Sequence, residues 1–244
     1  MPVPLIIGHR GASAVAPENT MAAFREAIAV GADGIEFDVR LTRDGVPVVI
    51  HDSTLRRTGN LNQRVADLTE QDLSKVDVGS WFKPGSFANE TVPRLSDVFE
   101  LFAANNLTLY LEMKCDEPAE YRPLAEACSR MIDEHALKAR VVVECFQLPA
   151  LAILREIDSQ IKTAALFDRV LMGQSIVARA TEIGAMAVAL HHRLARKALV
   201  ERSKQAGLHV AAWTVDDPIW IDRARAIGID ALITNDPARM IKLA

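Results

Sequence analysis

Short runs of apolar residues alternate with stretches of helical periodicity along most of the chain. The apolar runs predict strands at residues 4–8, 34–40, 46–50, 108–113, 140–145, 161–166, 186–190, 208–213 and 230–233. The helical periodicity predicts helices at residues 20–30, 96–105, 117–134, 148–157, 194–206 and 218–227, three of which are followed directly by a glycine. Strands that alternate with helices are typical of βαβ units, which pair their strands in parallel.

The second and third predicted strands are exceptional because only five residues separate them. A parallel connection needs a dozen or more residues, so these two strands must form an antiparallel hairpin. An Asp-Gly pair in the connection is a strong turn signal. If a four-residue turn places Leu41 opposite Val46, the same register places His51 opposite Glu36.

Eight predicted strands remain once the hairpin partner is set aside. Eight parallel strands with helices in 244 residues match the size of a TIM (β/α)8 barrel. An open, doubly wound sheet is the alternative, but no Gly-x-Gly-x-x-Gly motif follows the first predicted strand. We therefore expect an α/β fold with one TIM-barrel domain over residues 1–244 and an extra antiparallel hairpin strand. The long segment 52–93 has little helical pattern and is expected to form a small insertion subdomain.

Composition and charge narrow the class of protein. Half of the residues are apolar and a quarter are charged, which is ordinary for a globular chain. No apolar run is long enough to cross a membrane, and the net charge of −4 argues against nucleic-acid binding. Three cysteines without a Cys-x-x-Cys spacing argue against a disulfide framework. The N-terminus shows no signal-peptide pattern, so we expect a cytoplasmic protein without a stable membrane anchor.

Acidic side chains stand near the ends of two predicted strands. Glu36 and Asp38 are two residues apart and so share one face of a strand, and Glu112 lies near the end of another. Active groups of TIM barrels lie at the C-terminal ends of the strands, so we expect these three carboxylates to converge. Oxygen ligands of this kind favour Mg²⁺ or Ca²⁺ over zinc. The alternative is a structural network in which Glu36 pairs with Arg40 and Lys114.

Basic side chains and histidines are expected at the same edge. His9 and Arg10 end the first strand, Lys114 follows the strand of the third acid, and His51 ends the hairpin strand. Three carboxylates, a divalent cation and two basic residues leave one net positive charge, which suits a monoanion such as a phosphodiester. Two histidines can divide the proton transfers, one acting as base and the other as acid.

The residues that carry this chemistry stand in a recognisable order. The segment HRGASAVAPENTMAAFREAIAVGADGIEFDVRLTRDGVPVVIHD resembles the N-terminal signature of the glycerophosphodiester phosphodiesterase family. The resemblance continues in LTEQDLSKVDVGSWF, LYLEMK, AAWTVDDP and DALITNDP. It implies a TIM barrel that hydrolyses glycerophosphodiesters, with a metal ion, to glycerol 3-phosphate and an alcohol. It also implies first attack by the neighbouring glycerol hydroxyl to give a cyclic phosphate, which the residues alone do not distinguish from attack by water.

The resemblance further implies roles for individual residues. By position, His9 and His51 match the family's acid/base pair, Arg10 and Lys114 its phosphate contacts, Glu36, Asp38 and Glu112 its metal ligands, and Phe146 and Trp213 its substrate groove. The match is looser at the last strand, where Asn235 or Asp236 could line the site. Two alternatives stay open: a related barrel enzyme that cleaves phospholipid diesters, and a non-catalytic barrel that binds phosphorylated ligands.

Overall fold

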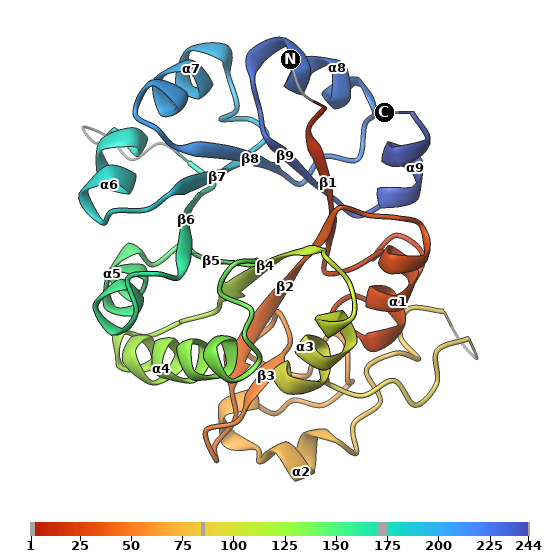
Figure 1. The fold of residues 1–244 in the computed structure, drawn as a ribbon. Coiled ribbons are helices and arrows are strands. Elements are labelled where there is room, and N and C mark those ends of the chain that lie inside the picture. Colours follow the sequence, from red (N-terminus) through yellow and green to blue (C-terminus); the bar gives the residue numbers. More distant parts are fainter. Residues whose placement is uncertain (1–2, 84–85, 170–174, 244) are drawn as a thin grey trace.

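Eight parallel strands form a closed barrel in the computed structural model, which describes residues 3–83, 86–169 and 175–243. The strands are β1 (Leu5–His9), β2 (Gly34–Leu41), β4 (Thr108–Met113), β5 (Val141–Cys145), β6 (Lys162–Phe167), β7 (Ala187–His191), β8 (His209–Trp213) and β9 (Ala231–Thr234). β1 pairs in parallel with both β2 and β9, which closes the ring (Figure 1). The predicted TIM barrel is therefore confirmed.

Helices surround the barrel on its outer side (Figure 1). They are α1 (Met21–Ala29), α3 (Leu95–Ala103), α4 (Pro118–Glu134), α5 (Leu148–Ile157), α6 (Ile176–Glu182), α7 (Lys197–Gln205), α8 (Ile219–Ile227) and α9 (Pro237–Lys242). Only α6 and α9 lie outside the predicted helices. Both are short, with side-chain caps from Ser175 and Asp236, and such segments carry too few turns to show a clear apolar period.

The extra strand β3 (Pro47–Val49) pairs antiparallel with β2 outside the ring, as predicted, but the predicted register is wrong by one residue. Leu41 pairs with Pro47, not with Val46. The turn closes between Thr42 and Val46 around a three-residue loop, in which Gly45 has a φ of 77°. A glycine in this left-handed conformation makes a bulge that adds one residue to one side of the hairpin and shifts the register.

The described residues between β3 and α3 form little regular structure. They include one turn of 3₁₀ helix (Val65–Asp67) and the short helix α2 (Glu70–Leu73), which the Thr69 side chain caps. A small apolar cluster that includes Leu55 and Leu73 packs this segment against the strand β3. The expectation of a single domain with an insertion at 52–93, two of whose residues lie outside the described ones, stays a prediction.

Alternation along the strands decides which side chains enter the barrel. Its interior is filled by an apolar cluster of Ile7, Tyr110, Leu166, Ala189, Ala211, Ala231 and Ile233, with Val142 at its edge. Because every second residue of a strand faces the same side, the positions two residues beyond these also face inward, at the C-terminal end of the barrel. Most of those positions bear polar or aromatic groups, among them His9, Glu112, Glu144, Trp213 and Asn235.

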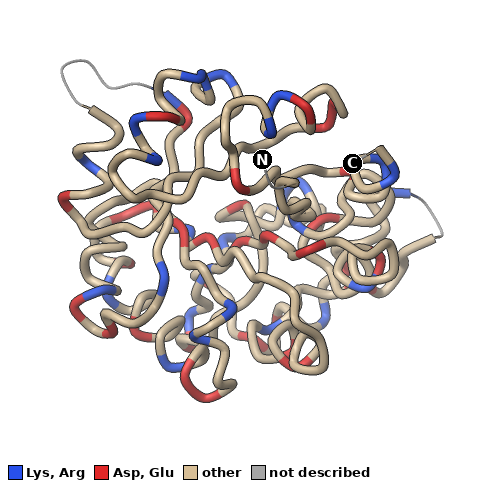
Figure 2. The backbone as a smooth tube through the Cα atoms, turned by 45° about the horizontal axis from the view of Figure 1, so that its top comes forward, with Lys and Arg blue, Asp and Glu red and all other residues tan. Residues whose placement is uncertain are grey.

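Charges of both signs are interspersed along the backbone (Figure 2). Among the described residues, no helix combines the length and the apolar character that a membrane crossing requires. The formal net charge of the chain is −4.

Candidate active site

A cavity of about 180 Å³ opens where the inward-facing polar positions gather. Its lining consists of His9, Arg10, Glu36, His51, Glu112, Lys114, Glu144, Phe146, Leu166, Trp213 and Ile233. The structure thus brings eight of the nine predicted site residues to one cavity. The ninth, Asp38, lies buried behind it, and Glu144 is a lining acid that the sequence analysis missed.

The loop after β1 holds Arg10 in an unusual backbone conformation. The φ of Arg10 is 56°, in the left-handed region that non-glycine residues rarely adopt, and its N–H donates to Glu36 at 3.0 Å. Gly11 follows with a φ of 83°, and a Cβ there would lie 2.7 Å from the backbone of Ala23. Close packing of this loop on α1 therefore fixes where the Arg10 side chain starts.

Asp38 organises the basic groups of the site. Its carboxylate lies 3.2 Å from the Arg10 guanidinium and 3.2 Å from the Lys114 ammonium, and it accepts a hydrogen bond from the Asn19 amide at 2.7 Å. Burial raises the pKa of Asp38, but Lys114 and Arg10 outweigh it and hold that pKa well below its usual range. Asp38 is therefore ionised, and it points the two basic side chains toward the cavity.

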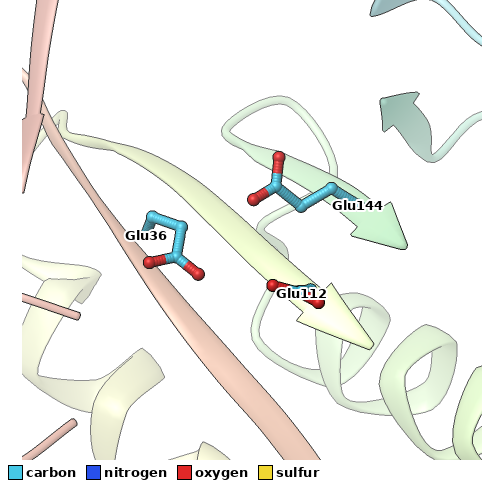
Figure 3. A group of neighbouring side chains, drawn as sticks. All are labelled: Glu36, Glu112 and Glu144. Atoms are coloured by element: carbon cyan, nitrogen blue, oxygen red, sulfur yellow. The ribbon is translucent and has the colours of Figure 1, made fainter. Parts of the chain in front are cut away.

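Three buried glutamates form a cluster beside Asp38. Each of these glutamates offers one carboxylate oxygen, and the three oxygens lie within 4.8 Å of one another; the residues are Glu36, Glu112 and Glu144. Figure 3 shows the three carboxyl groups turned toward a shared space from β2, β4 and β5. The signal that could have revealed Glu144 is a glutamate within an otherwise apolar buried strand, VVVEC, on the strand next to that of Glu112.

Burial strongly affects these acids. It raises the pKa of Glu112 to about 7, against the opposing effect of the Lys114 ammonium at 2.7 Å. Burial and the neighbouring carboxylates also raise the pKa of Glu36 and of Glu144 well above the usual range. Burying acids close together is costly unless positive charge compensates them, so this cluster favours the binding of a cation.

His9 is held in one tautomer by the end of β9. Its Nδ1 lies 2.7 Å from Oδ1 of Asn235, whose amide N–H donates in turn to the Asp216 carboxylate at 2.8 Å. The carboxylate of Asp216 can only accept a hydrogen bond, so the amide nitrogen of Asn235 faces Asp216 and the amide oxygen faces His9. Because that oxygen is an acceptor, the Nδ1 of His9 must carry the proton. Burial, followed by the Arg10 guanidinium, lowers the pKa of His9 to about 4, so the ring is neutral and its Nε2 is unprotonated.

His51 reaches the cavity from the residue stretch just after β3 and meets a different partner. Its Nδ1 lies 2.7 Å from the Asp52 carboxylate. Arg57 donates to Asp52 at 2.7 Å and to Glu18 at 2.7 Å, which ties the hairpin to the loop that carries Arg10. Burial lowers the pKa of His51, while the carboxylates of Asp38 and Asp52 oppose that shift.

Aromatic side chains border the other side of the cavity. The rings of Phe146 and Trp213 meet edge to face with centroids 5.6 Å apart. The Lys114 ammonium lies 5.9 Å from the centre of the Phe146 ring, which links the aromatic wall to the basic groups. The Trp213 ring also meets His191 edge to face, with centroids 5.2 Å apart, so the wall continues onto β7.

Fold and site together define the class of protein. A TIM barrel that joins an acidic, cation-attracting cluster, two basic side chains and two histidines at its C-terminal mouth is built as an enzyme that acts on a small anionic substrate.

The family follows from comparison with known proteins. The family model described as the glycerophosphoryl diester phosphodiesterase family matches residues 9–239, and the chain belongs to this family. The glycerophosphodiester phosphodiesterase of Caldanaerobacter subterraneus is 36% identical over 98% of this chain and 97% of that protein. The resemblance identified from the sequence, and the prediction of an enzyme of this family, are confirmed.

Solved structures agree with this assignment. A phosphodiesterase of Oleispira antarctica, solved in complex with the product sn-glycerol 3-phosphate, superposes with a TM-score of 0.91 at 26% identity and covers 99% of this chain and 96% of its own. The glycerophosphodiester phosphodiesterase of Thermotoga maritima superposes with a TM-score of 0.80 at 26% identity, with full coverage of both chains.

Proposed function

We propose that the protein hydrolyses glycerophosphodiesters to glycerol 3-phosphate and an alcohol, with a divalent cation and with His9 and His51 as the acid/base pair. The observation that carries the proposal is the meeting of both histidines, both basic residues and the acidic cluster in one cavity. The product found in the Oleispira antarctica relative supports the glycerol phosphate half of the substrate.

The predicted metal ligands are Glu36, Asp38 and Glu112, and the local chemistry suits them. Their donors are all carboxylate oxygens, which Mg²⁺ and Ca²⁺ prefer. Glu36 and Glu112 are buried and contribute oxygens to the cluster within 4.8 Å, a separation that one ion can bridge. A divalent cation bound there would supply positive charge to a phosphoryl oxygen.

Arg10 and Lys114 bind the phosphate in this proposal. Asp38 and Glu18 hold the Arg10 guanidinium, and Asp38 and Glu112 hold the Lys114 ammonium. Side chains fixed in this way lose little further entropy when the phosphate enters, so they stabilise the negative charge of the transition state effectively.

The two histidines differ in a way that assigns their roles. His9 is neutral and its unprotonated Nε2 lies toward the acidic cluster, 3.8 Å from Glu36, so it accepts the proton of the attacking oxygen. His51 is paired with the Asp52 carboxylate, which stabilises the protonated ring. His51 therefore donates a proton to the leaving alcohol oxygen.

Phe146 and Trp213 give the alcohol group an apolar and aromatic wall. A quaternary ammonium group such as that of choline is attracted to such ring faces. We propose the cytoplasm as the compartment, which the free thiols of all three cysteines support.

The test is release of glycerol 3-phosphate from glycerophosphocholine, glycerophosphoethanolamine and glycerophosphoglycerol, with lysophosphatidylcholine as the phospholipid alternative. We expect turnover of the first three, and a loss of about 10²- to 10⁴-fold in His9→Gln and in His51→Gln. His209→Gln is the matched control, because this histidine is exposed at the start of β8 and far from the cavity mouth. Near-normal turnover in either active-site variant, or turnover of lysophosphatidylcholine alone, would contradict the proposal.

A further inference from the structure

Glu144 is the acid of the cavity to which the sequence gives no role. It lies on β5 directly beside Glu112 of β4 in the strand register, and it is only 1% exposed. Its Oε2 has no hydrogen-bond partner among the described residues, although the side chain lines the cavity. A buried carboxylate oxygen without a partner is costly, so such a group is kept only where something compensates it.

No described basic side chain pairs directly with Glu144, although the charge of Lys114 acts on it from a distance. Lys114 contacts Glu112 at 2.7 Å and Asp38 at 3.2 Å, and Arg10 contacts Asp38 at 3.2 Å. Among the described residues, no ion pair reaches Glu144. The contacts of both basic groups are thus made with Asp38 and Glu112, and not with Glu144.

The geometry of the glutamates suits a shared ion. Ca²⁺ takes oxygen ligands at about 2.3–2.6 Å, so two ligands of one ion lie at most about 5 Å apart. The oxygens of Glu36, Glu112 and Glu144 lie within 4.8 Å of one another and point into the same space (Figure 3). All three carboxylates can therefore reach one cation without a change of strand position.

We propose that Glu144 is a further ligand of the divalent cation, which it shares with Glu36 and Glu112. The inference rests on the metal dependence in the proposed function and adds to it a ligand from β5. Added to the predicted set of Glu36, Asp38 and Glu112, Glu144 makes four carboxylates from the adjacent strands β2, β4 and β5 around the cation. More carboxylate ligands raise the affinity for Ca²⁺.

The experiment measures Ca²⁺ binding by isothermal titration to the metal-free protein, without substrate. Glu144→Gln keeps the shape of the side chain but removes its charge, and we expect the dissociation constant for Ca²⁺ to rise at least tenfold. Asp116→Asn is the matched control: it removes one negative charge just beyond β4, from a residue that pairs with Arg40 and not with the cluster. The control should stay within about threefold of the wild type.

An unchanged dissociation constant in Glu144→Gln, or an equal rise in both variants, would overturn the assignment. If Glu144→Gln fails to fold by circular dichroism, Glu144→Asp is titrated instead. This variant retains a carboxylate that is withdrawn by one methylene, and it should bind Ca²⁺ at least tenfold more weakly; binding at wild-type affinity would count against the proposal. If the wild-type protein binds no Ca²⁺, the same titrations are made with Mg²⁺, and binding of neither ion would refute the proposed metal dependence itself. If Glu144→Gln binds the ion as tightly as the wild type does, only the role of Glu144 is refuted.

Discussion

The hydrogen bond from His9 to Asn235 offers a sharp test of the proposed base. Replacing Asn235 with alanine removes the acceptor of the proton on Nδ1, because this nitrogen lies 2.7 Å from the amide oxygen of Asn235. The fold should survive, because Asn235 lies just beyond the end of β9 and the chain there continues into α9 with its own cap from Asp236. The substitution raises the free energy of the His9 tautomer that carries the proton on Nδ1 and a lone pair on Nε2.

The size of the effect follows from that lost bond. Leaving a buried donor without a partner costs about 1–3 kcal/mol, and each 1.4 kcal/mol is about tenfold in rate. If His9 must be in this tautomer to accept a proton, kcat/KM of Asn235→Ala should fall about 5- to 150-fold. The assay is the initial rate of glycerol 3-phosphate release from glycerophosphocholine, alongside the thermal unfolding midpoint.

The control for this substitution is Ser13→Ala. The Ser13 hydroxyl donates to the same oxygen of Asn235 at 3.0 Å, so its loss removes a donor and leaves the acceptor of His9 in place. We expect kcat/KM of this variant within about threefold of the wild type. An Asn235→Ala enzyme with wild-type kcat/KM would refute the idea that this contact sets the tautomer of the base.

Three further predictions concern other parts of the molecule. Burial lowers the pKa of His51 and the Asp52 carboxylate opposes that shift, so Asp52→Asn should lower the pKa of His51 further. If His51 acts as the acid, the basic limb of the profile of kcat/KM against pH moves to lower pH; a shift to higher pH contradicts that role. Lys114→Met removes the proposed charge-assisted contact with the phosphate, which is worth about 1.5–3 kcal/mol. The value of kcat/KM for glycerophosphocholine should then fall about 10- to 150-fold, and an unchanged value would exclude this phosphate contact. Gly11→Ala places a Cβ 2.7 Å from the backbone of α1 at a φ of 83°, whereas Gly45→Ala meets a similar φ with nothing within 4 Å. Both substitutions should lower the thermal unfolding midpoint, and Gly11→Ala should lower it by several degrees more than Gly45→Ala. Equal shifts would show that the close packing at Gly11 does not contribute to the loss of stability.

The barrel was accessible from the sequence because its determinants are local and repeated. Each apolar run is bounded by polar residues or glycine, and the short link after β2 marks β3 as antiparallel without any knowledge of the fold. The hairpin register was not accessible in the same way. It depends on whether Gly45 adopts the left-handed conformation of a bulge, and an Asp-Gly pair is compatible with turns of several lengths.

The candidate site was predictable to the extent that its residues stand at strand ends. His9, Arg10, Glu36 and Lys114 meet because parallel strands of a barrel end at the same mouth. Glu144 carries the signal of an acid in an apolar run, but the sequence does not show the strand register that sets it directly beside Glu112. The same holds for the contact of Asn235 with His9, which joins the first and last strands of the barrel.

The central claim is that a cation held by buried glutamates is needed beside the two histidines. The most direct measurement is glycerol 3-phosphate release from glycerophosphocholine by protein stripped of metal with a chelator, before and after Mg²⁺ or Ca²⁺ is returned. The account predicts that release stops on stripping and returns with one of the two ions. Release at the full rate from the stripped protein would contradict it.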